Sequence, residues 1–221
     1  MPLSDHFLET SSQVRNWGRW GADDQLGTLN LITPEVVLAA RDCIRHGRTI
    51  PLAVPLEHDG IQVGFVPGRD NPTMALHALN EGMDPDDDPD SFHTSDDHVS
   101  LGLQAGTHWD GLCHVSYSGM VYNGYDASSI TAAEGATRCG IQHLRSVCTR
   151  GVLLDVARTR GVDLLECPYA ITADDLDAAA EMGGVEVRAG DIVLVRTGRM
   201  SLYHTGGGMA YCLGPGQDGS N

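Results

Sequence analysis

The spacing of apolar residues along the chain predicts a few regular elements separated by long polar stretches. The first element is a helix over residues 33–47, "TPEVVLAARDCIRHG". Thr33 is suited to its N-cap, Pro34 to its first turn and Gly47 to its end. At helical spacing, one face of this helix would carry Val37, Ala40, Arg41 and Ile44. Residues 48–60, "RTIPLAVPLEHDG", read as extended, and their two prolines confine them to an edge or irregular strand.

Residues 84–98, "DPDDDPDSFHTSDDH", have no hydrophobic period and many carboxylates. Such acidic runs are usually solvated loops, so we favour a loop over a metal site that would use His93 and His98. From Val99 the pattern becomes strictly alternating and predicts a half-buried strand. If the backbone stays extended through Gly106, the two-residue period places Gln104, His108 and Asp110 on one side.

A strand, helix and strand are predicted in the last third of the chain. Residues 151–157 and 190–198 are short, branched and apolar, as in buried strands. Between them Thr172 and Asp175 form a possible capping box, and Gly183 a helix stop. Asp155 and Arg196 lie at the strand ends, where functional groups can gather, although a structural ion pair is the favoured reading.

The glycine-rich residues 203–221 predict no terminal helix or strand. His204 within them is read as a surface residue on a flexible tail, with an approach to the functional site as the alternative.

Composition narrows the class of protein. A chain of 221 residues with 41% hydrophobic residues, 27 glycines and 10 prolines is typical of a loop-rich α/β or α+β domain. Its formal charge of −16 argues against nucleic acid and anionic membranes as partners. There is no signal-peptide pattern and no apolar window long enough to span a bilayer, so a cytoplasmic location is expected. The six cysteines lack a C-x-x-C spacing, and most of them are read as reduced thiols.

The stretch with the most chemistry is "QAGTHWDGLCH", residues 104–114. Imidazole and carboxylate together suit zinc, manganese or iron, and a catalytic ion needs about three protein ligands. His108 and Asp110 provide two such ligands, and His114 has a pKa range suited to proton transfer. Two histidines and an aspartate within a dozen residues also occur in ordinary polar loops, which is the alternative interpretation. For Cys113, packing as a small apolar side chain is favoured over a role as a ligand.

This stretch closely resembles the H-x-G-T-H-x-D-x-P-x-H signature of the cyclase family, which includes bacterial kynurenine formamidase and isatin hydrolase. Further segments also resemble the family, namely "WGADDQLGTLNLITPE", "YNGYDA", "GVLLDVAR" and "GDIVLVRTG". The resemblance implies a divalent metal, Mn or Zn, bound by Gln104, His108 and Asp110, with His114 as the catalytic acid/base. Gln104 replaces the signature's first histidine and Leu112 its proline. A glutamine oxygen is a harder and weaker donor than imidazole. A role for Gln104 as a metal ligand and a role as a side chain that hydrogen-bonds the backbone are equally favoured.

The same resemblance implies an α/β protein with a swivelling β/β/α fold and a central mixed sheet. It also implies hydrolysis of an amide, or a lactone, in a small cyclic or aryl substrate. Trp109 is expected in the core, while Trp17 and Trp20 are candidates for an aryl pocket or for a core or interface role.

Two other classes of function remain open. Gln104 is compatible with an inactive binding or scaffold protein that keeps the fold. A cysteine hydrolase using Cys113 and His114 is disfavoured, because adjacent residues of an extended segment point apart.

We expect residues 1–221 to form a single cyclase-like domain that lacks its C-terminal part, since the family's remaining ligands and closing strands have no match after "RTG". In the alternative, His204 or His143 replaces the absent ligand. A homodimer or higher homo-oligomer is expected, because a sheet without its last strands exposes an edge.

Overall fold

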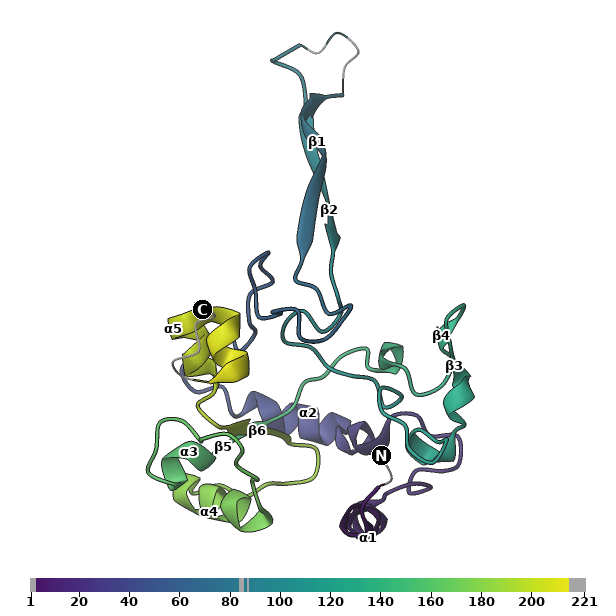
Figure 1. Ribbon diagram of the computed structural model, residues 1–221, viewed down its shortest axis with the longest axis vertical. Coiled ribbons are helices and arrows are strands. Elements are labelled where there is room, and N and C mark those ends of the chain that lie inside the picture. Colours follow the sequence, from purple (N-terminus) through teal and green to yellow (C-terminus); the bar gives the residue numbers. More distant parts are fainter. Residues whose placement is uncertain (1–2, 84–85, 87, 215–221) are drawn as a thin grey trace. The chain divides into compact units, whose positions relative to one another are not determined.

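The computed structural model describes residues 3–83, 86 and 88–214 and shows a mixed α/β protein with small sheets (Figure 1). The chain forms two compact units, each assembled from three stretches. Unit 1 consists of Met1–Arg48, Trp109–Leu153 and Gly184–Leu194. Unit 2 consists of Thr49–His108, Leu154–Gly183 and Val195–Asn221. In the described part of the chain no helix is both long and apolar enough to cross a membrane.

Unit 1 begins with two helices, α1 (Asp5–Val14) and α2 (Pro34–Arg41). The predicted start of α2 is confirmed, because the Thr33 hydroxyl accepts a hydrogen bond from the Val36 N–H at 3.4 Å. The predicted end at Gly47 is wrong. The helix stops at Arg41, and Ile44 is 73% exposed. Asp42, Cys43 and Ile44 are all poor helix formers, so one turn follows instead of a continued helix.

The remainder of unit 1 is mostly loops around a small core that includes Val121 and Cys139. A short antiparallel hairpin pairs β3 (Ile130–Thr131) with β4 (Gly135–Ala136). Its turn is held by the Glu134 N–H, which donates to the Thr131 hydroxyl at 3.0 Å.

Unit 2 contains an antiparallel ribbon of β1 (Thr73–Gly82) and β2 (His93–Ser100). The prediction of a loop over residues 84–98 is therefore wrong from His93 onward, because cross-strand pairing with β1 overrides the polar composition. Positions 84, 85 and 87 lie outside the described residues. Residues 48–60 contain no strand and end in a turn in which the Gly60 N–H bonds the Glu57 carbonyl.

The predicted continuation of the strand beyond Ser100 is also wrong. The Ala105 N–H bonds the Gly102 carbonyl at 2.9 Å, so the chain turns before the motif instead of running extended into it. Val99 and Leu103 are 53% and 78% exposed, so most of the face that was predicted to be buried is open to solvent. The alternation alone could not reveal that no layer packs against it.

The predicted strand, helix and strand are confirmed as β5 (Gly151–Asp155), α4 (Ala173–Gly183) and β6 (Ile192–Arg196), with β5 beside β6 in one sheet. A short helix, α3 (Val156–Thr159), follows β5. The capping box is present, because the Thr172 N–H donates to Asp175 at 2.9 Å and the Asp175 N–H to the Thr172 hydroxyl at 3.3 Å. Gly183 is the last helical residue, and Gly184 takes the left-handed conformation, φ +59°.

A terminal helix, α5 (Met200–Leu213), contradicts the prediction that this end has none. Burial of Leu202 and Ala210 supports it despite its run of glycines, and it kinks at Gly207, where φ is +67°. The exposed His204 therefore lies on a helix and not on a flexible tail, while residues 215–221 lie outside the described part.

Candidate active site

The residues of the motif are divided between the two units. Gln104 and His108 belong to unit 2, whereas Asp110 and His114 belong to unit 1. The extended backbone that was predicted to align Gln104, His108 and Asp110 is absent, because residues 101–110 contain turns and bends and no strand.

In unit 2 the motif is anchored by a backbone carbonyl and a side-chain hydroxyl. The Gln104 carbonyl accepts a hydrogen bond from the Gln62 side chain at 2.5 Å, and the Thr107 hydroxyl accepts one from the Val54 N–H at 2.9 Å. His108 Nδ1 lies 2.7 Å from the Gly106 carbonyl oxygen. Because a carbonyl can only accept, this contact favours the tautomer with Nδ1 protonated and the lone pair on Nε2, as in many metal-binding histidines.

In unit 1 the motif forms a turn that brings Asp110 and His114 together. The His114 N–H bonds the Gly111 carbonyl at 2.9 Å, and His114 Nδ1 lies 3.7 Å from Asp110 Oδ1. Gly111 is required at this turn, since a Cβ there would lie 2.7 Å from the Ile141 nitrogen. A carboxylate this close can orient the imidazole ring.

Asp110 also lines a cavity of about 500 Å³ that lies wholly within unit 1. Its walls come from four stretches, residues 25–32, 109–112, 139–144 and 188–192. Most of the lining is apolar, with Leu29, Ile32, Trp109, Leu112, Ile141, Leu144 and Ile192 among its members. This size and character suit a small, largely apolar ligand. Trp109 is 51% exposed, so its predicted place in the core is wrong.

The wall at residues 25–32 is fixed by a network that joins two of the family-like segments. The Asp24 carboxylate accepts hydrogen bonds from the Tyr122 hydroxyl at 2.8 Å, the Asn30 amide at 2.7 Å and the Gly27 N–H at 2.9 Å. Burial alone would raise the pKa of Asp24, but these hydrogen bonds outweigh it and lower the pKa. Burial and the adjacent Asp24 raise the pKa of Tyr122. Asp24 therefore stays ionised, and the Tyr122 hydroxyl keeps the proton that it donates to Asp24.

Asn123, the residue after Tyr122, extends this network. Its amide nitrogen donates to the carbonyls of Gly21, Ala22 and Asp24 at 3.0 to 3.1 Å, and its oxygen accepts from the Gly18 N–H at 2.7 Å. Asn123 has φ +61°, a conformation that asparagine tolerates better than most residues.

The wall at residues 139–144 is tied to the first wall by one hydrogen bond. The Gln25 side-chain oxygen accepts from the Cys139 N–H at 2.8 Å. Burial raises the pKa of the Cys139 thiol to about 11, so this sulfur stays protonated and packs as a small apolar group. His143, named above as an alternative ligand, also lines the cavity.

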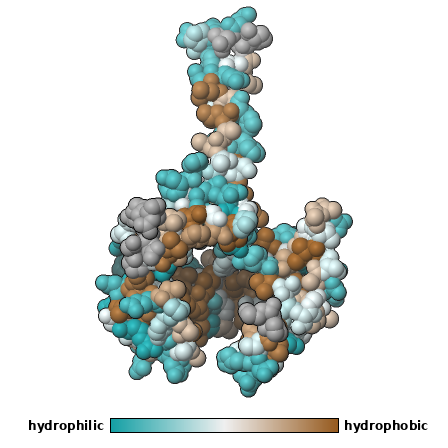
Figure 2. Space-filling view, viewed as in Figure 1, coloured by the Kyte–Doolittle hydropathy of each residue, from teal (hydrophilic) through white to brown (hydrophobic). Residues whose placement is uncertain are grey.

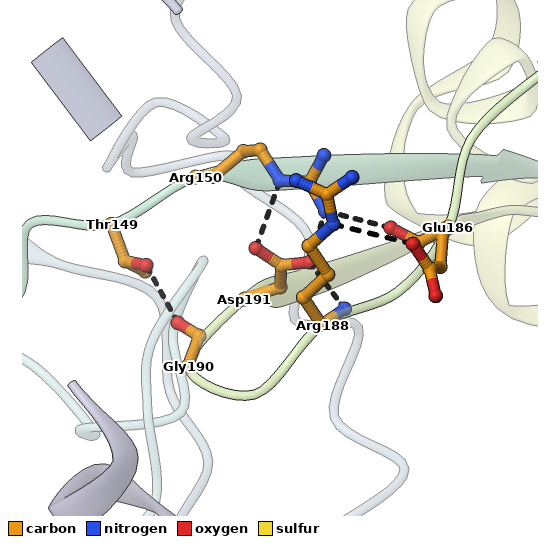
Figure 3. Close-up of polar contacts among 6 residues, drawn as sticks. All are labelled: Thr149, Arg150, Glu186, Arg188, Gly190 and Asp191. Atoms are coloured by element: carbon orange, nitrogen blue, oxygen red, sulfur yellow. Dashed lines mark hydrogen bonds and ion pairs between the residues drawn. The ribbon is translucent and has the colours of Figure 1, made fainter. Parts of the chain in front are cut away.

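The wall at residues 188–192 is held by the polar network in Figure 3. Arg150 donates to both carboxylate oxygens of Asp191, at 3.0 and 2.6 Å, and to the Glu186 carbonyl at 2.7 Å. The Thr149 hydroxyl donates to the Gly190 carbonyl at 2.6 Å, and the Arg188 N–H to Asp191 at 2.7 Å. The Arg150 hydrogen bonds lower the pKa of Asp191, despite its burial. These contacts tie the loop to Thr149 and Arg150 beside the cavity.

Other candidate residues have structural partners. Arg196 and Asp155 form an ion pair at 2.8 Å, as favoured from the sequence. Trp17 and Trp20 are half-buried, and each lies under an arginine guanidinium, that of Arg15 or Arg19. Neither tryptophan is among the residues that line the unit 1 cavity.

Among residues 3–83, 86 and 88–214, no three His, Cys, Asp or Glu side chains gather closely enough to hold a metal ion. Most of the cavity walls had no sequence signal, because apolar residues from four distant stretches meet only in the folded unit. The family-like segment near the start marked residues 25–32 as important without revealing that they form a wall.

The comparisons with known proteins agree with the resemblance. The family model described as "Putative cyclase" matches residues 49–219, and the chain therefore belongs to this cyclase family. It is similar to a solved structure described as the crystal structure of a novel cyclase, with 35% sequence identity and a TM-score of 0.76. That similarity covers 88% of this chain and 64% of the other, so the chain spans less than two thirds of that protein's length. No curated protein matches.

Proposed function

We propose that this chain is a metal-dependent hydrolase that cleaves an amide bond, or a lactone, in a small cyclic or aryl substrate. The observation that carries the proposal is the position of Asp110. This residue of the family signature lies on the wall of a largely apolar cavity of about 500 Å³ and beside His114. The activity would resemble that of kynurenine formamidase or isatin hydrolase.

The donor chemistry of the motif fits a divalent ion, Mn or Zn, held by His108, Asp110 and Gln104. The hydrogen bond from His108 Nδ1 to a backbone carbonyl is the usual support for a metal-binding imidazole. Such an ion supplies a water of lowered pKa and polarises the scissile carbonyl.

The chain's own residues would supply the remaining steps. His114 would carry a proton to the leaving nitrogen or oxygen, with Asp110 holding its ring in orientation. Trp109 and the aliphatic walls of the cavity would hold the aryl ring and exclude bulk water, which strengthens polar interactions at the reacting bond.

The proposal extends to the wider setting of the chain. It includes the swivelling β/β/α arrangement with a central mixed sheet, a single cyclase-like domain over residues 1–221, a cytoplasmic location and a homo-oligomeric state. Its support is membership of the cyclase family and the similarity to a solved cyclase.

The experiment is a screen of aryl formamides, isatin-like lactams and lactones against the purified chain, with and without added Mn or Zn. Metal-dependent hydrolysis of one class, together with metal bound near stoichiometry, is the expected result. Asp110→Asn should lower metal content, whereas Asp42→Asn, an exposed aspartate of the same unit, should not. Absence of both metal and turnover would favour the alternative, a cyclase-fold binding or scaffold protein, to which the replacement at Gln104 points.

A further inference from the structure

The β1–β2 ribbon of unit 2 presents an apolar face to solvent. Met74 pairs with Val99 and Leu76 with Asp97, so these four side chains share one face. Met74, Leu76 and Val99 are 72%, 54% and 53% exposed. Apolar side chains continue toward the far end of the ribbon at Leu79, Met83 and Phe92, each about 70% exposed. Figure 2 shows this apolar surface along the ribbon.

A ribbon of this kind is not stable by itself. Two strands alone are at best marginal in water, and a face of exposed Met, Leu and Val favours burial. Its edges are unsuited to adding a further strand, because the register shifts between Leu76 and Ala78 and again between Ala78 and Glu81. Such irregularities interrupt the row of hydrogen-bonding groups that another strand would need. The ribbon therefore favours a partner that covers its face.

The charge of the ribbon defines that partner further. Residues 73–100 contain no lysine or arginine, and their acidic residues are Glu81, Asp84, Asp86, Asp87, Asp88, Asp90, Asp96 and Asp97. Asp97 lies on the apolar face itself, opposite Leu76. Two ribbons would repel one another, so the complementary surface must be both cationic and apolar.

A surface with this chemistry exists in unit 1. Residues 41–48, "RDCIRHGR", are exposed throughout and contain Arg41, Arg45, Arg48 and His46. Ile44 lies in the middle of them and is 73% exposed. The one acidic residue, Asp42, contacts Arg41 at 3.1 Å. Arginine is well suited to bind carboxylates at an interface because its planar guanidinium forms paired hydrogen bonds and is weakly hydrated.

We infer that the apolar face of the β1–β2 ribbon binds residues 41–48 of a second copy of this chain. Every copy carries both surfaces, so the contact can close into a symmetric assembly. Ile44 would pack among Met74, Leu76 and Val99, and arginine side chains would reach the ribbon's carboxylates. The inference rests on the homo-oligomer in the proposed function and gives it a specific surface, but it does not depend on the hydrolase chemistry.

The test is sedimentation of the full chain over a wide concentration range, without substrate. The parent should associate reversibly. Leu76→Ser, Asp97→Arg and Arg45→Glu should each weaken association about tenfold or more, as expected for central interface residues. Val14→Ser and Glu166→Arg change exposed residues elsewhere and serve as controls.

Mixing the two charge-reversed variants tests the contact more specifically than measuring each variant alone. Chains with Asp97→Arg and chains with Arg45→Glu should associate poorly alone but regain parent-like affinity when mixed, since opposite charges then meet in both contacts. A parent that stays monomeric, or variants that associate as tightly as the parent, would overturn the inference. Circular dichroism of each variant excludes unfolding as the cause. Because no hydrolysis is measured, failure here is separable from failure of the proposed function.

Discussion

Asp175 illustrates how one buried carboxylate can fix the start of a helix. Its side chain is 3% exposed and accepts hydrogen bonds from the Thr172 N–H at 2.9 Å, the Tyr169 hydroxyl at 3.0 Å and Arg160 Nε at 2.8 Å. The Thr172 backbone hydrogen bond, with those from Arg160 and Tyr169, outweighs the effect of burial and lowers its pKa to about 2. The carboxylate is therefore ionised at neutral pH.

Linkage predicts how this residue affects stability. A folded pKa of about 2, below the ordinary 3.8, means that the stabilisation is complete above pH 3.8 and is lost as the pH falls toward 2. Asp175→Asn should lower the melting temperature at neutral pH and lose this dependence. Thermal unfolding of parent and variant over a pH series measures it, with Asp174→Asn in the same helix turn as control. A parent-to-variant difference that is constant from pH 5 to pH 2 would contradict the linkage.

His114→Ala tests the proposed acid/base residue. Loss of a positioned proton-transfer group lowers turnover by about 10² to 10⁴. Metal content should stay at the parent level, since the proposed ligands are unchanged. His46→Ala, an exposed histidine of the same unit, is the control for both measurements. Loss of metal in His114→Ala would instead make this residue a ligand.

At the scale of elements, local signals were sufficient for β5, α4 and β6. The capping pair Thr172 and Asp175 and the uninterrupted apolar runs each specify their element within a few residues. The β2 strand was missed because pairing with the preceding strand β1 overcomes its acidic composition. The helix α5 was missed because it packs against residues distant in sequence, such as Gly60 and Ile61, which overcomes its run of glycines. The same limit applies to the candidate site, where the motif was visible and the cavity walls were not.

Gly190→Ala tests the cavity wall formed by residues 188–192. Gly190 has φ +88°, and a Cβ there would lie 2.7 Å from the Leu31 carbonyl oxygen and 2.9 Å from Val36. Gly184 also has a positive φ, +59°, but no atom within 4 Å of the added carbon. Gly184→Ala should therefore cost about 1 kcal/mol from backbone strain alone. Gly190→Ala should cost about 1 to 3 kcal/mol more from overpacking. Urea unfolding of both variants measures the loss in the free energy of unfolding. Equal losses would show that α2 shifts without cost to make room for the added methyl group.

At the scale of the whole molecule, association and stability are coupled. If only folded chains associate, association stabilises the folded state, and the melting temperature rises with protein concentration. The parent should show this rise, whereas Leu76→Ser should melt at a temperature independent of concentration. Differential scanning calorimetry over a dilution series measures it, with Val14→Ser expected to behave as the parent. A concentration-independent parent would mean that the ribbon contact does not contribute to stability.

The interleaving of the two units also determines when the protein can fold during its synthesis. Each unit draws on three stretches, and unit 1 includes both the first residues of the chain and Gly184–Leu194. A Cβ at position 190 would lie within 3 Å of Leu31 and Val36, so this late segment lies against residues that leave the ribosome much earlier. Contacts of such long sequence separation form slowly. The helix α2 therefore lacks its neighbour at residue 190 until nearly all of the described chain has been made. No contiguous fragment that ends before β6 contains a whole unit.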